Sequence, residues 1–192
     1  LDALGGLEFS SCFEAGCGFG WNIRRIKEAY PDARVAGLDF SLGQLMSSKQ
    51  YLAGHDIDVS QGDNRSMPFV DNAFDIGFSV GVFMNIHKDC INDAVKEMIR
   101  VCGKYIIHLE YDEDNTSDEL RDKRSIKTNI VSHDYKKLYE SHGQKVIKFS
   151  TYRDFGNAFD EHIKKVDGAL DWWEGFEGPE KYILIVVEIA DK

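Results

Sequence analysis

Cysteine is scarce in this chain, and the few cysteines present show no pairing pattern. The 192 residues include four, with no C-x-x-C pair and no regular ladder of spacings. Three lie in or beside segments that we expect to form core elements, where cysteine acts as a small hydrophobic residue. We therefore expect all four to be reduced and structural, which argues against secretion and favours a cytoplasmic protein. They are Cys12, Cys17, Cys90 and Cys102.

Basic residues are also few relative to acidic ones. The chain has 23 Lys and Arg against 33 Asp and Glu, a formal net charge of −10. One basic cluster, Arg121, Lys123 and Arg124, lies within an acidic run and is typical of a solvated loop or helix face. Nucleic-acid binding relies on clustered positive charge, so we expect no nucleic-acid partner. A small acid with one carboxylate or phosphate is compatible with this charge.

Long hydrophobic runs and histidine pairs at metal-binding spacing are missing as well. The longest apolar run, residues 181–189, has the length of a strand, and a bilayer span needs about 20 residues. We expect no membrane partner, although a chain that starts at Leu1 leaves a removed signal peptide open. The six histidines lack paired helical spacing, so no metal site is expected. No P-loop occurs.

The most informative segment is a glycine-rich turn at residues 13–20. Its pattern is acid-x-G-x-G-x-G, from Glu14 through Gly16, Gly18 and Gly20. Such glycines let the backbone turn sharply and bring a nucleotide-like ligand close to bare N–H groups. A dinucleotide-binding G-x-G-x-x-G loop would have its third glycine at position 21, where this chain has Trp21. A structural turn without a ligand is the alternative.

A second acidic position follows at the spacing of a βαβ unit. Residues 21–31 carry apolar positions at helical spacing and end at Pro31. Residues 34–39 then form a buried strand that ends in Asp39. An acid at the tip of this second strand can accept hydrogen bonds from both hydroxyls of a ribose. The alternatives for Asp39 are a helix N-cap or a solvated loop acid.

A third strand, residues 56–63, ends in Gly62-Asp63 and is followed by Asn64, a Met-Pro-Phe turn and the acid-rich run 71–75. Taken alone, the Gly-Asp-Asn segment could be a simple turn. Taken with the two earlier motifs, residues 9–111 resemble class I S-adenosylmethionine (SAM) methyltransferases. The resemblance implies that Asp63 accepts a hydrogen bond from the adenine amino group and that the Asn64 N–H donates one to a ring nitrogen. It also implies that Val80 and Gly81, at the end of the fourth strand, touch the methionine portion of SAM.

The resemblance also implies the fold and the cofactor. We expect an α/β, three-layer, Rossmann-like methyltransferase fold. Its mostly parallel seven-stranded sheet should have the order 3-2-1-4-5-7-6 and an antiparallel last strand. The segment 80–106 looks most like a small branch, some members of which accompany surface-glycan and nonulosonic-acid genes. The residues that the resemblance assigns to SAM binding are Glu14, Gly16, Cys17, Gly18, Asp39, Phe40, Asp63, Asn64, Val80 and Gly81.

The remaining segments complete one domain over residues 1–192. Helices are expected at 88–100 and 134–142, and strands at 103–111, 145–149 and 181–189. Two other segments are candidates for a substrate lid or insert. Residues 112–132 are polar, and 151–180 are rich in aromatic side chains that could close a substrate pocket, form a dimer face or pack as a satellite core. The oligomeric state is left open.

The expected reaction is methyl transfer from SAM to the oxygen or nitrogen of a small-molecule acceptor. His87 is the first candidate base and Glu110, at the end of the fifth strand, the second. The alternative for His87 is a helix-start residue that bonds the backbone, and we favour it slightly over the catalytic role. Two other functions stay open: a non-catalytic SAM-binding partner subunit and an NAD-type oxidoreductase. Trp21 and the expected antiparallel last strand argue against the oxidoreductase.

Overall fold

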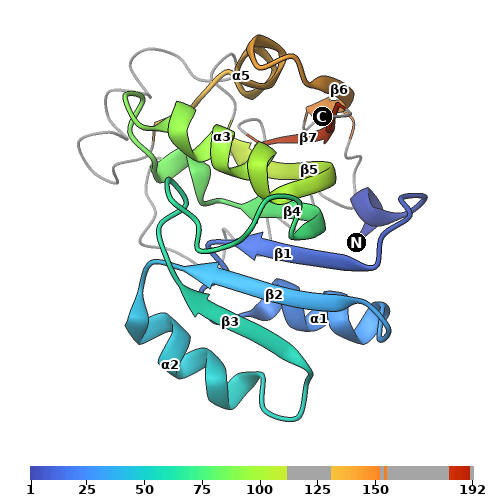
Figure 1. The fold of residues 1–192 in the computed structure, drawn as a ribbon, viewed down its shortest axis with the longest axis vertical. Coiled ribbons are helices and arrows are strands. Elements are labelled where there is room, and N and C mark those ends of the chain that lie inside the picture. The colour runs from blue at the N-terminus through green and yellow to red at the C-terminus, as the bar shows by residue number, and fades with distance from the viewer. Residues whose placement is uncertain (112–130, 152–153, 155–181, 191–192) are drawn as a thin grey trace.

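A mixed seven-stranded sheet runs through the protein, a computed structural model of which describes residues 1–111, 131–151, 154 and 182–190 (Figure 1). Its strand order, β3-β2-β1-β4-β5-β7-β6, confirms the predicted order. β7 pairs antiparallel with both β5 and β6, as predicted, whereas β1 to β5 are parallel. The strands are β1 Ser11–Ala15, β2 Arg34–Asp39, β3 Ile57–Gln61, β4 Phe74–Val80, β5 Cys102–Tyr111, β6 Lys145–Thr151 and β7 Tyr182–Glu188.

Four α-helices and two short 3-10 helices surround the sheet in the described residues. The helices are α1 Trp21–Ala29, α2 Leu42–Tyr51, α3 Ile91–Val101 and α5 Tyr135–Ser141, with η1 Asp2–Leu4 and η2 Phe83–Asn85. Asp134 caps α5 by accepting the Lys137 N–H, within the predicted range of this helix. α3 starts three residues later than predicted. α2, which was not predicted, begins after Ser41, whose hydroxyl oxygen accepts the Gln44 N–H.

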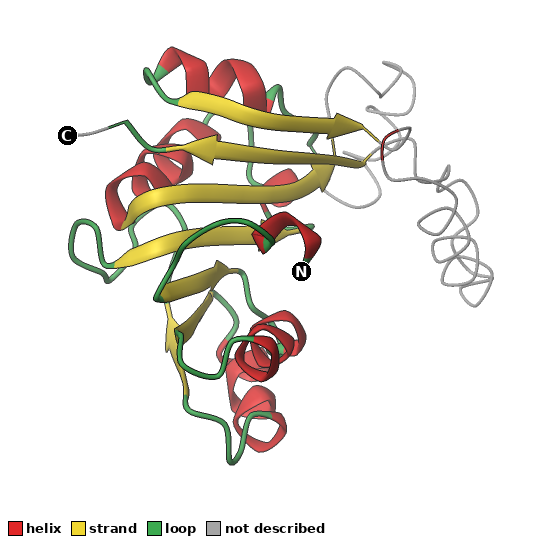
Figure 2. Cartoon of the chain, turned by 90° about the vertical axis from the view of Figure 1, so that its right-hand side faces the viewer, coloured by secondary structure: helices red, strands yellow, loops and turns green. Residues whose placement is uncertain are grey.

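The helices form separate layers on the two faces of the sheet (Figure 2). On one face, Ile23 and Ile26 of α1 pack with Leu45 of α2 and the sheet residue Val35. On the other face, a second core joins α3 and α5 to the sheet. Ile106 belongs to this second core, while its neighbour Ile107 belongs to the first, because successive strand residues face opposite sides. The chain therefore has the three-layer α/β architecture that its sequence predicts.

The strand order determines where a ligand can enter. From β1 the chain crosses to β2 and β3 on one side, and β4 then returns to pair with the other side of β1. In open α/β sheets this reversal leaves a crevice at the carboxyl ends of the strands. The glycine loop follows β1 at this edge, and Gly81 follows β4 there. The fold thus brings together at one edge segments that are about 65 residues apart in the sequence.

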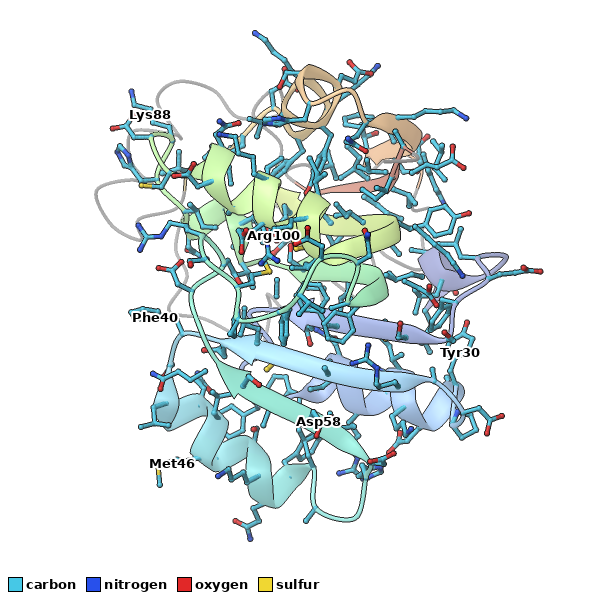
Figure 3. All side chains as sticks on the ribbon, in the orientation of Figure 1. Tyr30, Phe40, Met46, Asp58, Lys88 and Arg100 are labelled. Carbon is cyan, nitrogen blue, oxygen red and sulfur yellow. The ribbon has the colours of Figure 1, made fainter. Side chains whose placement is uncertain are left out.

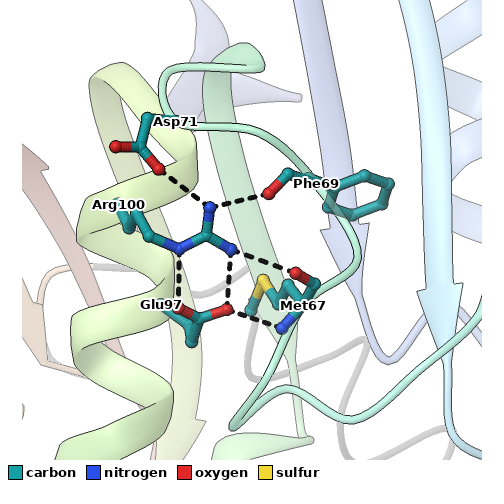
Figure 4. Close-up of polar contacts among 5 residues, drawn as sticks. All are labelled: Met67, Phe69, Asp71, Glu97 and Arg100. Carbon is teal, nitrogen blue, oxygen red and sulfur yellow. Dashed lines mark hydrogen bonds and ion pairs between the residues drawn. The ribbon is translucent and has the colours of Figure 1, made fainter.

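One arginine ties α3 to the loop between β3 and β4 (Figure 4). Arg100 donates to the carbonyl oxygens of Met67 and Phe69, at 3.0 and 2.6 Å, and pairs with Asp71 at 3.0 Å. It also pairs with Glu97, one turn earlier on α3, whose Oε2 accepts the Met67 N–H at 2.6 Å. Backbone carbonyls in a loop without regular pairing need donors, and Arg100 supplies them. The loop that follows Asp63 is held in place by this cluster.

The cysteines agree with the expectation from the sequence. All four are free, Cys12, Cys17 and Cys102 are buried, and Cys90 is partly exposed. Burial raises the pKa values of the Cys12 and Cys17 thiols to about 12. Because the thiolate is the reactive form, these two side chains are inert at neutral pH.

Candidate functional site

The glycine loop folds back over the end of β2. The N–H groups of Gly16 and Cys17 both donate to the carbonyl oxygen of Leu38, at 2.7 and 2.9 Å. Gly16 has a φ of +81°, and a Cβ atom on it would lie 2.5 Å from the Cγ atoms of Val82. Glycine alone fits this position, because it tolerates positive φ and has no Cβ to collide with Val82. The loop therefore contacts both β2 and the segment after β4.

Asp39 connects the end of β2 to the same loop. Its Oδ2 accepts the Gly18 N–H at 2.7 Å, and its Oδ1 accepts the Ser41 N–H at 2.8 Å. A carboxylate offers about four lone-pair sites, so two bonds leave room for two further donors. Apart from Gly18 and its two chain neighbours, no atom of the described residues lies within 4 Å of the Cβ position at Gly18. The structure thus places Asp39 beside an open space over the glycine loop, with spare acceptor capacity.

Glu14, the acid that opens the motif, is buried below the loop. Its Oε1 accepts a hydrogen bond from the Asn22 side chain at 2.7 Å, and its Oε2 has no hydrogen-bond partner within the described part of the chain. Burial raises the pKa of Glu14 to about 8, against the opposing effect of the Asn22 hydrogen bond. An unpaired buried carboxylate oxygen is costly, so this atom is suited to a polar ligand group or an ordered water. The sequence analysis did not identify Asn22 as its partner.

Asp63 lies at the end of β3 and is already paired with a basic residue. Arg65 contacts both carboxylate oxygens through its guanidinium, at 2.5 to 3.0 Å, and donates its own N–H to Oδ1 at 2.8 Å. The Arg65 hydrogen bonds lower the pKa of Asp63 and keep it ionised. Asn64 is half-buried beside it. The acid-x-Arg spacing was a signal for this pair that sequence reasoning did not use.

The remaining predicted cofactor residues differ in exposure. Phe40 is 76% exposed at the rim of the site, where Figure 3 shows it pointing outward. Cys17 is buried, so the polar contact that it offers is its backbone. Val80 is partly exposed, and Gly81 turns away from β4 with a φ of +65° after its N–H donates to the Leu109 carbonyl at 2.9 Å. A hollow of about 420 Å³ adjoins Val80, with mostly apolar walls from η1, α1 and the sheet.

The two candidate bases lie in very different surroundings. His87 is exposed, its Nδ1 accepts the Asp89 N–H at 3.3 Å, and its carbonyl oxygen accepts the N–H groups of Cys90 and Ile91. These bonds fit the helix-start reading and leave the imidazole accessible. Glu110 is fully buried and accepts hydrogen bonds from Ser79 and from three backbone N–H groups. A saturated, inaccessible carboxylate is unsuited to take a proton from an acceptor, so we withdraw Glu110 as a candidate base.

Several predicted features lie outside the described residues. These are the lid segment over 112–130 and nearly all of the aromatic insert 151–180. No three His, Cys, Asp or Glu side chains within the described ranges are placed to hold a metal ion. None of the helices in these ranges has the length and apolar character needed to cross a membrane.

Comparison with known proteins finds methyltransferases. Residues 13–104 match a family model described as a methyltransferase domain. Demethylmenaquinone methyltransferase from Desulfitobacterium hafniense (strain Y51) is 40% identical over 83 residues, which are 40% of this chain and 32% of that protein. Demethylmenaquinone methyltransferase from Renibacterium salmoninarum is 34% identical over 113 residues, 56% of this chain and 44% of that protein. The matched region thus spans less than half of either relative.

A solved structure supports the fold across nearly the whole chain. Geranyl diphosphate C-methyltransferase from Streptomyces coelicolor A3(2), in complex with Mg²⁺, geranyl diphosphate and S-adenosyl-L-homocysteine (SAH), matches with a TM-score of 0.76 at 14% identity. The match covers 94% of this chain and 74% of that one. At this identity the likeness concerns the fold alone, while the matching sequence motifs concern the cofactor. Residues 13–104 thus match a methyltransferase domain, and the chain has the fold of solved SAM-dependent methyltransferases.

Proposed function

We propose that this protein transfers the methyl group of SAM to an oxygen or nitrogen atom of a small-molecule acceptor. The observation that carries the proposal is the convergence of four separate motifs on one edge of the sheet. The glycine loop, Asp39, Asp63 and Gly81 follow β1, β2, β3 and β4, and the first two are directly hydrogen-bonded. A groove bounded by these residues matches the succession of motifs that the family uses for its cofactor.

The residues present fit this cofactor. Asp39 has acceptor sites left for two ribose hydroxyls, and the open space at Gly18 leaves room for the ribose beside it. Asp63 would accept the adenine amine while paired with Arg65, and Gly81 would allow close approach of the methionine end. When bound, SAM supplies a sulfonium-linked methyl group that is open to in-line attack. The protein's part is to orient the acceptor, exclude water and help to remove a proton.

A small acceptor suits the composition and the relatives. The net charge of −10 disfavours a polyanionic polymer. The proteins with which this chain is compared are named for small acceptors, demethylmenaquinone and geranyl diphosphate. The resemblance to the surface-glycan branch adds sugar-like molecules and small acids to the classes worth testing. The four free cysteines support a reducing compartment such as the cytoplasm as the place of action.

Removing Glu110 from the candidate bases supports a second function. His87 is then the one base candidate that we retain, and we propose that it lies within one water of the reacting atom. If the protein uses no acceptor, it acts instead as a non-catalytic SAM-binding partner subunit. The match of residues 13–104 to a methyltransferase-domain model gives no support to an NAD-type oxidoreductase.

A labelled-methyl screen separates these two functions. The protein would be incubated with SAM carrying an isotopic methyl group and with sets of sugars, carboxylic acids, quinols and prenyl diphosphates. Transfer by the wild type that is lost in Asp39→Ala supports the enzyme. Tight SAM binding without transfer to any set favours the partner-subunit function. Retained transfer in Asp39→Ala contradicts the assigned groove.

A further inference from the structure

Glu110 is buried near the end of β5. Its carboxylate accepts four hydrogen bonds, one from Ser79 of β4 and three from the segment 82–84 that follows β4. Oε1 accepts the Ser79 hydroxyl at 2.5 Å and the N–H groups of Val82 and Phe83 at 3.0 and 3.1 Å. Oε2 accepts the Met84 N–H at 3.2 Å. Three consecutive backbone donors on one carboxylate fix the path of the segment 82–84. This segment therefore takes its shape from a side chain on the neighbouring strand.

The polar neighbours of Glu110 supply donors that point toward it. Ser79 Oγ also lies 2.6 Å from His108 Nδ1, and His108 Nε2 lies 2.6 Å from the Tyr139 hydroxyl. Burial lowers the pKa of His108 to about 3, so its ring is neutral at physiological pH. In one arrangement that fits these distances, Tyr139 donates to Nε2, Nδ1–H donates to Ser79, and Ser79 donates to Glu110. Burial raises the pKa of Glu110, and the hydrogen bonds from Ser79 and the three backbone N–H groups oppose that rise.

The segment that Glu110 holds is in direct contact with the glycine loop. Val82 packs so closely against Gly16 that a Cβ atom there would lie 2.5 Å from it. Gly81, next to Val82, is the residue that we assign to the methionine end of the cofactor. An uninterrupted series of contacts therefore runs from Glu110 through Val82 to the wall of the groove on the methionine side. Asp39 and Asp63, on the nucleoside side, are not part of it.

We propose that Glu110 is a positioning residue that holds the segment 82–84 against Gly16 and thereby shapes the part of the groove that receives the amino-acid portion of SAM. This inference rests on the proposed cofactor site and extends it. In this role Glu110 acts through the backbone of the segment 82–84 and takes no proton from the acceptor. Its consequence is selective: loss of the carboxylate should weaken ligands that carry the amino-acid portion and spare those that have the nucleoside alone.

The test compares two ligands that differ in that portion. SAH contains it, whereas 5′-methylthioadenosine has the nucleoside and sulfur without it. In Glu110→Gln, an amide N–H₂ would replace one acceptor oxygen and face backbone donors. We expect the dissociation constant for SAH to rise by about tenfold or more and that for methylthioadenosine to change by less than about twofold. Equal weakening of both ligands, or of neither, would overturn the proposal.

Two further variants keep the test decisive. Glu97→Gln is the matched control, because Glu97 also accepts a backbone N–H but belongs to the Arg100 cluster and bonds the loop between β3 and β4 instead of the segment 82–84. It should leave the ratio of the two affinities unchanged. If Glu110→Gln does not fold, Val82→Ala, which leaves the buried carboxylate intact, decides. An unchanged ratio in folded Val82→Ala rejects the proposal, and a selective loss of SAH affinity supports it. Absence of SAH binding by the wild type would instead refute the cofactor site.

Discussion

The Gly18 N–H donates to Asp39 Oδ2 at 2.7 Å, so the glycine loop and the acid at the tip of β2 form one unit. Asp39 was expected from the sequence to bind ribose. In the structure it also holds the loop that would lie under the cofactor. The same carboxylate accepts the Ser41 N–H just before α2 begins. Its removal should consequently affect both ligand binding and the local backbone.

Asp39→Ala should weaken SAM binding by about 1.5–3 kcal/mol, because hydrogen bonds to a charged group are lost. It should also lower the free energy of unfolding by about 1 kcal/mol, because the Gly18 and Ser41 donors lose their acceptor. Calorimetric titration and urea denaturation measure the two effects. Asp58→Ala is the matched control, since Asp58 is exposed in β3 and lies away from the carboxyl end of that strand (Figure 3). Unchanged SAM affinity in Asp39→Ala would mean that Asp39 shapes the turn and does not bind the cofactor.

Gly16→Ala and Gly18→Ala form an informative pair. Both glycines have positive φ, at +81° and +50°, so each alanine adds backbone strain of about 1–2 kcal/mol. At Gly16 the new methyl group also collides with Val82, whereas at Gly18 it enters open space. We expect Gly16→Ala to cost roughly 1–3 kcal/mol more unfolding free energy than Gly18→Ala. Gly18→Ala should nevertheless lose SAM affinity, because its methyl group enters the space that we assign to the cofactor. Normal SAM binding by Gly18→Ala would mean that the cofactor binds elsewhere.

Glu14 should make the unliganded protein less stable as the pH rises. Burial raises its pKa from 4.5 to about 8, so between these values the folded state retains a proton that the unfolded state releases. Since the folded state binds more protons there, the free energy of unfolding falls with increasing pH. Glu14→Gln should flatten this part of the stability profile. Denaturation curves measured at several pH values test this. If the unfolding free energy of Glu14→Gln falls with pH as steeply as that of the wild type, Glu14 is not the source of the pH dependence.

Glu97 should make the folded protein less stable as the pH falls in the acidic range. The hydrogen bonds from Arg100 lower its pKa, so the stabilisation is present above the ordinary glutamate pKa and is lost as the pH falls through the lowered value. Arg100→Met should remove this acidic loss together with the contacts to Met67 and Phe69, and so lower stability near neutral pH. The pH profile of thermal unfolding tests this. A profile that kept the wild-type acidic slope would exclude the pair as its source.

The resemblance to class I SAM methyltransferases predicted the sheet order, and the spacing within the first βαβ unit predicted that the glycine loop and Asp39 lie together. They did not predict α2, in which Leu45 and Ser48 are the buried residues and the apolar periodicity is weak. They also assigned Glu110 to catalysis from its place at a strand end. Whether the segment 82–84 folds over that carboxylate depends on tertiary contacts, which spacing along the chain does not encode.

Calorimetric titration of the folded protein with SAH, in parallel with NAD, tests the central claim most directly. The account predicts one SAH site per chain, no detectable NAD binding, and weaker SAH binding in Asp39→Ala but not in Asp58→Ala. Absence of SAH binding by a protein with a cooperative unfolding transition, or equal binding by both aspartate variants, would contradict the groove formed by Gly16, Gly18, Asp39, Asp63 and Gly81.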